Sequence, residues 1–295
     1  MKIIVSGGAG FIGSHLCEKL LQQRHEVICI DNLISGSFNN IKPFSDQKNF
    51  RFLLHDVTVA FPEDFTGIDQ IYNLASPASP KDYLIMPLQT LWTNAAGTKQ
   101  LLELCQKNGA AFLQASTSEV YGDPLEHPQN ENYWGNVNPI GERSCYNEGK
   151  RFAESLAMNY HRHYRMPMVI ARIFNTYGPR MRKSDGRVIS NFIDAALRDE
   201  PLKIYGNGDQ TRSFCYVDDL VEGLIAAMNS KNIIGPINIG NDAEITILEL
   251  AQKIIHLCGS NSLLTNIALP SDDPRKRRPD LSLAHEKIQY YPKIE

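Results

Sequence analysis

The chain opens on Ile3-Ile4-Val5-Ser6-Gly7-Gly8-Ala9-Gly10-Phe11-Ile12-Gly13, and this segment decides its fold. A short apolar run leads into a glycine-rich turn, and apolar residues then recur at helical spacing through Leu16 and Leu20. Glycines at 7, 10 and 13 allow the turn to tighten, backbone N–H groups to approach a pyrophosphate, and the helix to pack on the strand. The segment therefore predicts the first strand–turn–helix unit of a dinucleotide-binding domain.

A carboxylate ends the second predicted strand. Val27-Ile28-Cys29-Ile30 leads to Asp31, eighteen residues past Gly13. A carboxylate at this position accepts hydrogen bonds from the adenosine ribose hydroxyls and repels a 2′-phosphate. The spacing therefore favours NAD over NADP, against the alternative of a glycine turn that binds nothing.

Strand and helix signals continue to alternate through the first 174 residues. A helical pattern at 88–105 stops at Asn108-Gly109, which is a good helix C-terminus. Buried strands are predicted at 51–54, 70–74, 111–115 and 168–174. Alternation of this kind predicts an α/β fold with a doubly wound parallel sheet.

Composition limits the classes of function. The chain has 295 residues and a net charge of −3, which gives no reason to expect nucleic acid or an anionic membrane as partner. No apolar run approaches ~20 residues, and the N-terminus leads directly into a strand, so neither a membrane span nor a signal peptide is expected. The six cysteines include no CxxC pair and predict reduced core thiols in a cytoplasmic protein. No metal site is predicted, because His161-Arg162-His163 has no further ligands nearby.

Two short segments carry the chemistry. Ser116-Thr117-Ser118-Glu119 follows a predicted strand, and Tyr146-Asn147-Glu148-Gly149-Lys150 begins the next helix. A spacing of four places Tyr146 and Lys150 on one helix face. A phenol titrates near ~10, and a nearby ammonium lowers that pKa. The pair can then take a proton from a hydroxyl that releases a hydride; taken alone, the two residues read as surface neighbours.

Basic residues gather after Gly178-Pro179. Guanidinium groups suit a diphosphate because their geometry is bidentate, although a solvated basic face would look similar. The region includes Asn175, Arg180, Arg182, Lys183, Arg187, Tyr205, Gln210 and Arg212. A second basic run, 275–278, has acidic neighbours that argue against a nucleic-acid site. Further on, Thr246-Ile247-Leu248-Glu249 is a capping box that predicts a helix start.

The glycine turn, Asp31, Thr117, Tyr146 and Lys150 together resemble the extended short-chain dehydrogenase/reductase family, the NAD-dependent nucleotide-sugar epimerases and dehydratases. More narrowly, the chain resembles the UDP-glucuronate decarboxylases of that family. The narrower resemblance rests on Leu74-Ala75-Ser76-Pro77-Ala78-Ser79-Pro80, Ser116 to Pro124, Tyr133-Trp134-Gly135, Asn138-Pro139-Ile140-Gly141, Arg172-Ile173-Phe174-Asn175, Asp185-Gly186-Arg187-Val188 and Asp272-Asp273-Pro274.

The resemblance implies a Rossmann domain with a smaller α/β C-terminal substrate domain. We expect residues 1–178 and about 210–243 to form the NAD-binding unit. Residues about 179–209 and 244–295 should form the nucleotide-sugar unit, with UDP-glucuronate as the substrate. The helical patterns at 87–108 and 146–164 match the pair with which this family forms homodimers.

Residue patterns and resemblance together assign the site. The catalytic residues are predicted to be Thr117, Ser118, Glu119, Tyr146, Lys150 and Arg277. NAD is predicted to contact Gly7, Gly10, Phe11, Ile12, Gly13, Asp31, Asn32, Asp56, Val57, Leu74, Ala75, Ser76, Asn94, Tyr146 and Lys150. The nucleotide sugar is predicted to contact Asn175, Arg180, Arg187, Val188, Tyr205, Gln210, Arg212, Arg277 and Asp280.

The implied reaction is decarboxylation through a 4-keto sugar, with NAD recycled and with Glu119 and Arg277 serving the middle step. Other 4,6-dehydratases and 4-epimerases of the family remain alternatives. Ser118-Glu119 argues against the dTDP-glucose type, which carries Asp-Glu, but GDP-mannose dehydratases share Ser-Glu. A non-catalytic NAD-binding protein is disfavoured because the Thr117, Tyr146 and Lys150 set is intact.

The chain departs from the family pattern at two places. Trp92 stands where the family usually has lysine before Thr93-Asn94. The sequence also stops about where the family adds a final helix, which would expose apolar surface and weaken stability or dimer formation.

Overall fold

The computed structural model describes residues 1–230, 233–268 and 276–294. The Asp272-Asp273-Pro274 stretch and Arg275, which the sequence singled out, lie outside the described residues. Across the described ranges, no helix has both the length and the apolar character needed to cross a lipid bilayer.

A parallel seven-stranded sheet forms the centre of the molecule, in the order β11-β6-β5-β4-β1-β2-β3. The strand order runs outward in opposite directions from β1 and β4, so a crevice opens between them at their carboxyl ends. This topology confirms the predicted doubly wound Rossmann fold. The strands are β1 (Lys2–Ser6), β2 (Glu26–Asp31), β3 (Phe50–Leu54), β4 (Gln70–Asn73), β5 (Ala111–Thr117), β6 (Met168–Ile173) and β11 (Ile237–Ile239).

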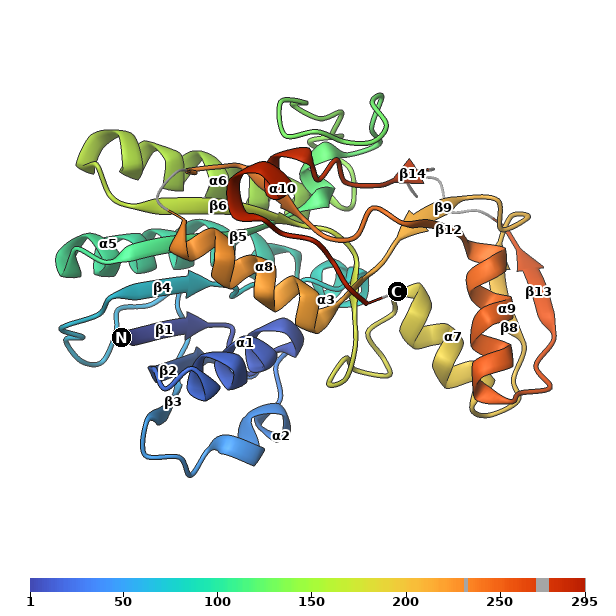
Figure 1. Cartoon of the computed structure of the whole chain (residues 1–295), viewed down its shortest axis with the longest axis horizontal. Coiled ribbons are helices and arrows are strands. Elements are labelled where there is room, and N and C mark those ends of the chain that lie inside the picture. Colours follow the sequence, from blue (N-terminus) through green and yellow to red (C-terminus); the bar gives the residue numbers. More distant parts are fainter. Residues whose placement is uncertain (231–232, 269–275, 295) are drawn as a thin grey trace.

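Helices cover both faces of this sheet (Figure 1). Alternate residues of β1 show the two layers, because successive side chains of a strand point to opposite faces. Ile3 packs into a core with α1 (Phe11–Gln22) and α8 (Val217–Asn229). Ile4 packs into a second core with α5 (Thr98–Asn108) and α6 (Ser144–Tyr164). Coverage on both faces explains why the strands read as apolar runs.

The helix expected at 88–105 is interrupted. It begins as α4 (Pro87–Trp92), continues as a π-helical turn, η2 (Thr93–Gly97), and resumes as α5. The amide nitrogen of Asn94 donates to the Thr90 carbonyl and to the Ser76 hydroxyl, both at 2.9 Å. The wider turn thus orients a buried amide toward the loop after β4, a placement that apolar periodicity alone does not reveal.

A smaller unit with its own core lies beside the carboxyl edge of the large sheet (Figure 1). It consists of α7 (Val188–Ala196), β8 (Leu202–Tyr205), α9 (Ile247–Cys258) and β13 (Leu264–Ile267). The predicted capping box is present, since the Thr246 hydroxyl and Glu249 satisfy each other's backbone N–H groups. The remaining elements are α2 (Phe38–Ile41), η1 (Lys42–Phe44), α3 (Pro80–Ile85), η3 (Ser118–Tyr121), β7 (Thr176–Tyr177), β9 (Thr211–Ser213), β10 (Cys215–Tyr216), β12 (Glu244–Thr246), β14 (Lys276–Arg277) and α10 (Ser282–Ile288).

The C-terminal segment returns to the large sheet. Leu281, Ala284 and Tyr290 are buried in the same core as α1 and α8. The Tyr290 hydroxyl donates to the Gly240 carbonyl at 2.8 Å. From Leu281 onward the described chain therefore packs against the core of α1 and α8, with Tyr290 as a buried anchor.

We predict that Tyr290→Phe lowers the free energy of unfolding by about 1–3 kcal/mol, because the buried Gly240 carbonyl loses its partner. Tyr291→Phe is the matched control: its ring is largely exposed, so the change should stay within about 0.5 kcal/mol. Urea unfolding followed by circular dichroism measures both. Equal stability of the two variants would contradict the anchoring role.

Candidate active site

A cavity of about 920 Å³ opens at the carboxyl ends of the central strands, between the two units. Most of the predicted site residues line it. From the larger unit these are Gly7, Gly10, Phe11, Ile12, Gly13, Asp31, Asn32, Asp56, Val57, Leu74, Ala75, Ser76, Thr117, Ser118, Glu119, Tyr146, Lys150 and Asn175. From the later segments they are Arg180, Arg187, Val188, Tyr205, Gln210, Arg212 and Arg277.

Two predicted residues do not line the cavity. Asn94 lies one layer behind, where it donates to the Ser76 hydroxyl, and its buried carbonyl oxygen has no partner among the described residues. Asp280 lies just before α10, where its carboxylate accepts from the backbone N–H of Ser282 at 2.9 Å. Its predicted contact with a ribose hydroxyl stays a prediction.

The glycine turn fits a dinucleotide. Gly7 has φ +72°, and a Cβ there would stand 2.8 Å from the backbone of Leu74 and Ala75. A Cβ on Gly13 would stand 2.1 Å from the Gly7 carbonyl oxygen. Only glycine permits this approach of helix to turn, which leaves the first N–H groups of α1 free to face a pyrophosphate.

Asp31 ends β2 at the same edge. Its two carboxylate oxygens accept from the backbone N–H groups of Ala9, at 3.0 Å, and Leu33, at 2.8 Å. Burial raises the pKa of this carboxyl, and the two hydrogen bonds act in the opposite direction. A Cβ on Gly36 would stand 3.0 Å from both oxygens, so the glycine leaves one side of the carboxylate open. Each oxygen keeps a lone pair for a ribose hydroxyl, and the residues present therefore fit NAD.

Tyr146 and Lys150 face the cavity from the first turns of α6. The Lys150 ammonium lies 5.9 Å from the centre of the Tyr146 ring and donates to the Ala115 carbonyl at 2.9 Å. Burial lowers the pKa of Lys150 to about 8. Burial also raises the pKa of Tyr146, and the groups that oppose it are the Thr117 hydroxyl and the cations of Arg187 and Arg143. The lowering of this pKa that the sequence assigned to Lys150 is not found here: burial dominates, and the cations that oppose it are Arg187 and Arg143.

Glu119 and Arg277 meet although they are far apart in the sequence. They form a buried ion pair, and Arg277 also donates to the Gly122 carbonyl at 3.0 Å. Arg277 reaches the site because β14 pairs with β9, which sets it opposite Arg212. Burial raises the pKa of Glu119, but Arg277 and Arg143 hold it below its usual value. The structure thus brings together the carboxylate and the cation that the family resemblance placed at one step.

Sequence reasoning missed two residues of this site, Arg143 and Tyr83. An Arg143 nitrogen lies 3.2 Å from a Glu119 carboxylate oxygen, and another donates to the Tyr83 hydroxyl at 3.0 Å. The Tyr83 ring stacks on Tyr146, with centroids 5.0 Å apart and planes 7° from parallel. Arg143 precedes Tyr146 by three residues, which was a usable helical signal. Tyr83 comes from a distant segment, and only tertiary packing reveals it.

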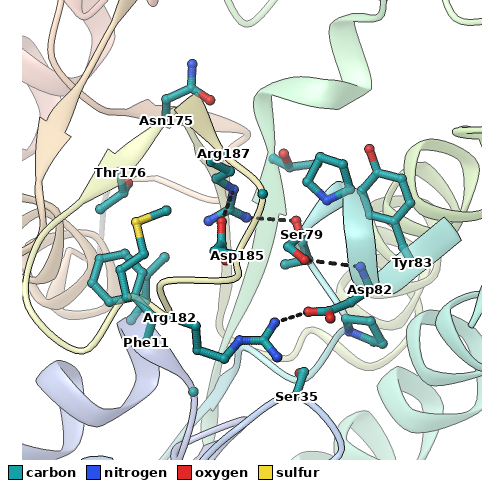
Figure 2. A pocket seen from close by; sticks show the side chains of 18 of the residues that line it. Phe11, Ser35, Ser79, Asp82, Tyr83, Asn175, Thr176, Arg182, Asp185 and Arg187 are labelled. Carbon is teal, nitrogen blue, oxygen red and sulfur yellow. Dashed lines mark hydrogen bonds and ion pairs between the residues drawn. The ribbon is translucent and has the colours of Figure 1, made fainter. Parts of the chain in front are cut away.

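The arginines after Gly178 bridge the two units. Figure 2 shows Arg182 pointing at Asp82 of α3, with which it forms an ion pair, and Arg187 beside Asp185. Arg187 also donates to the Ala78 carbonyl at 2.7 Å. Arg180 pairs with Glu18 of α1. These three cations therefore all line the cavity.

A family model described as the NAD dependent epimerase/dehydratase family matches residues 3–240. This chain belongs to that family. Membership confirms the predicted NAD cofactor and the resemblance stated from the sequence.

Members with known names are similar along the whole chain. Two Arabidopsis thaliana proteins named UDP-glucuronic acid decarboxylase 1 and 6 are each 52% identical to it, over 294 and 296 residues. The matches cover 100% of this chain and 67% and 85% of those proteins. A solved family member is the UDP-glucuronic acid 4-epimerase from Bacillus cereus, in complex with UDP-glucuronic acid and NAD. It aligns with a TM-score of 0.86 and 33% identity, covering 100% of this chain and 95% of that one.

We predict that Asp31→Ala lowers the affinity for NAD and removes the preference over NADP, because the ribose loses its acceptor and a 2′-phosphate is no longer repelled. The shift of the unfolding temperature with each dinucleotide measures both effects. Asp46→Ala, an exposed aspartate outside the cavity lining, is the control. Wild-type protein that binds NADP as tightly as NAD would refute the role of Asp31.

Proposed function

We propose that this chain converts UDP-glucuronate into UDP-xylose and CO2, with NAD bound and regenerated in each turnover. The observation that carries the proposal is the buried Glu119–Arg277 ion pair in the same cavity as Thr117 and Tyr146. With NAD bound as the hydride acceptor, oxidation of a sugar hydroxyl needs only Thr117, Tyr146 and Lys150, whereas decarboxylation also needs a proton route and a nearby cation. The names of the relatives that are 52% identical support the same conclusion.

In this proposal the larger unit, 1–178 with about 210–243 and the segment from 281, holds NAD. The smaller unit, about 179–209 with 244–280, holds the nucleotide. NAD, when bound, would accept the hydride from C4 of the sugar and return it at the end. The Asp31 carboxylate and the glycine turn would bind its ribose and pyrophosphate. Arg187 and Arg212, which line the cavity, would bind the diphosphate of the substrate.

Proton transfer at C4 belongs to Tyr146. Its phenol oxygen would take the proton of the C4 hydroxyl, while the Thr117 hydroxyl, already hydrogen-bonded to it, orients the C4 oxygen. Taking that proton requires the phenolate, which burial disfavours, so the cations around Tyr146 are needed to stabilise it. Arg143 and Arg187 act directly on the phenol, and the Lys150 ammonium stands beside the ring.

The middle step belongs to Glu119 and Arg277. A ketone at C4 is β to the C6 carboxylate, so the C5–C6 bond can break, CO2 leaves, and the electron pair moves into an enolate. Glu119 stays ionised beside Arg277 and Arg143, which suits it to organise delivery of a proton to C5. The Arg277 Nε is buried and has no partner among the described residues, so this cation keeps a donor for the substrate.

A 4-epimerase is the second candidate, because a solved family member with that name was crystallised with UDP-glucuronic acid. The two reactions differ in mass: epimerisation keeps every atom of the sugar, whereas decarboxylation removes CO2. A mass spectrum of the nucleotide sugar after incubation with UDP-glucuronate separates them. A product of unchanged mass would reject the decarboxylase proposal, and a 4-keto pentose would show release of the intermediate.

We predict that Glu119→Gln and Arg277→Lys each lower turnover by roughly 10²–10⁴-fold while UDP still binds, because both act after the first oxidation. Tyr146→Phe should instead block that oxidation, so no NADH absorbance appears. Glu148→Gln, a partly exposed glutamate on α6 outside the cavity lining, is the control and should keep its activity. Near-normal UDP-xylose formation by Glu119→Gln would sink this mechanism.

We propose that the protein is a homodimer that pairs through α4, α5 and α6. Large apolar side chains are exposed on this face: Leu88 and Trp92 on α4, and Phe152 on α6. Exposed apolar residues on neighbouring helices favour association with a second copy. Trp92, which departs from the family pattern, belongs to this exposed set and not to the cavity lining.

We predict that Leu88→Glu converts the dimer into a monomer at micromolar concentration, because a charge would be buried between two copies. Leu257→Glu is the control: Leu257 is exposed on α9 of the smaller unit, away from these helices, so the same change there should leave assembly unchanged. Light scattering measures both variants. A monomeric wild-type protein would reject the dimer.

We also propose a cytoplasmic setting. All six cysteines are free, and five of them are buried. Unpaired core thiols are typical of proteins kept in a reducing compartment.

A further inference from the structure

Residues 179–187 connect β7 to α7 and are fastened to the larger unit at two places. At the first place, Arg180 forms an ion pair with Glu18 of α1. On the same helix, the Nε2 of His15 lies 3.0 Å from the Pro179 carbonyl oxygen. The segment is thus a strap, one end of which is held by the helix that follows β1.

The second place is the region after β4, where α3 begins. Arg182 forms an ion pair with Asp82 of α3, and their side chains are 37% and 15% exposed. Arg187 donates to the Ala78 carbonyl at 2.7 Å, just before the same helix. Figure 2 shows the ion pair, with Phe11 at the start of α1 below it in the view. The strap is therefore also fastened to the helix that follows β4.

These two fastenings lie on either side of the crevice between β1 and β4. The strand order reverses at this point, and α1 and α3 follow the carboxyl ends of the two strands. A dinucleotide binds at such a reversal, with its pyrophosphate at the first turn of the helix after β1. Phe11, Asp82 and Arg182 line one cavity. A segment that reaches from α1 to α3 therefore crosses the route by which NAD would enter and leave this crevice.

We propose that the strap slows the exchange of NAD and that the Arg182–Asp82 ion pair is the latch that keeps the strap closed. A latch joins two parts of the protein and does not contact NAD. Breaking it should therefore speed entry and exit together and leave the Kd for NAD nearly unchanged. Slow exchange suits the cofactor recycling proposed above, but the inference itself rests only on NAD binding in the crevice.

The alternative is that Arg182 binds the pyrophosphate of NAD directly. The two residues of the pair would then act in opposite directions, because Asp82 would compete with the pyrophosphate for the cation. Asp82→Asn would free Arg182 and tighten NAD binding, whereas Arg182→Gln would weaken it. A latch predicts instead that both changes speed release to the same extent, and that the double variant releases NAD no faster than either single one.

The test measures NAD release from the full-length protein with no nucleotide sugar present. Protein loaded with NAD and freed of excess is mixed with an excess of alcohol dehydrogenase and ethanol, which reduce each released NAD to NADH. The rise of NADH absorbance gives the release rate, calorimetric titration gives Kd, and their ratio gives the entry rate. We expect Asp82→Asn and Arg182→Gln each to speed release by about 2–5-fold, as for loss of a partly exposed ion pair, with Kd within about twofold of wild type.

Glu63→Gln is the matched control. It breaks an ion pair with Arg51 that is partly exposed and lies outside the cavity lining, so NAD release should stay at the wild-type rate. Exchange of the two latch charges, Asp82→Arg with Arg182→Asp, should restore slow release.

Salt keeps the proposal testable if the single variants do not fold. Salt screens a partly exposed ion pair, so a latch predicts that wild-type entry and release both become faster as sodium chloride is raised. A direct contact with the pyrophosphate predicts slower entry instead.

Two results would overturn the proposal. One is a release rate that coincides in wild type, Asp82→Asn and Arg182→Gln, and the other is a Kd that moves in opposite directions in the two variants. A wild type that releases no CO2 from UDP-glucuronate, while both variants exchange NAD faster, would reject the proposed reaction and support the strap.

Discussion

The hydrogen bond from the Lys150 ammonium to the Ala115 carbonyl joins the two segments on which the site depends. A parallel strand must be covered on both faces, so its chemistry can appear only where it ends. Here β5 ends in Thr117, and the next two residues, Ser118 and Glu119, also line the cavity. Forming this bond requires the Lys150 ammonium to be buried, and this burial lowers its pKa. This bond fixes α6, and with it Tyr146, at a set distance from the oxygens at the end of β5.

Much of this arrangement could be predicted from the sequence because the signals are local. The glycine turn works only if backbone atoms touch, so it specifies strand, turn and helix together. Asp31 follows at the distance of one strand–helix–strand unit, and Tyr146 and Lys150 share a face by helical spacing. For Glu119 and Arg277 the prediction came from family resemblance, since nothing in the intervening residues shows that β14 returns beside β9.

Other features depend on packing and could not be predicted in this way. The π-helical turn at Thr93–Gly97 leaves the apolar pattern almost unchanged, so periodicity predicted one helix. Tyr83 reaches Tyr146 only because α3 packs against α6. The pKa of Tyr146 depends mainly on burial, which cannot be predicted from the presence of a lysine four residues later. Nothing in the sequence around Tyr290 distinguishes it from an exposed aromatic residue, although its ring is buried in the core that contains α8.

The arginines of the 179–187 segment show how the two units hold each other. Arg180 and Arg182 pair with Glu18 and Asp82 of the larger unit, so their charge is already compensated. A diphosphate offers a stronger, bidentate partner for guanidinium groups. In the substrate-binding role proposed above, such a ligand would exchange one set of ion pairs for another, so these arginines would have an anionic partner in both states.

The return of the chain at Tyr290 has a mechanical consequence. With the division into units proposed above, the backbone passes back and forth between them and finally ends within the larger one. Several connections therefore act side by side, and neither unit can swing away about a single flexible joint. A protease cut in any one connection would leave the two units still linked by the others.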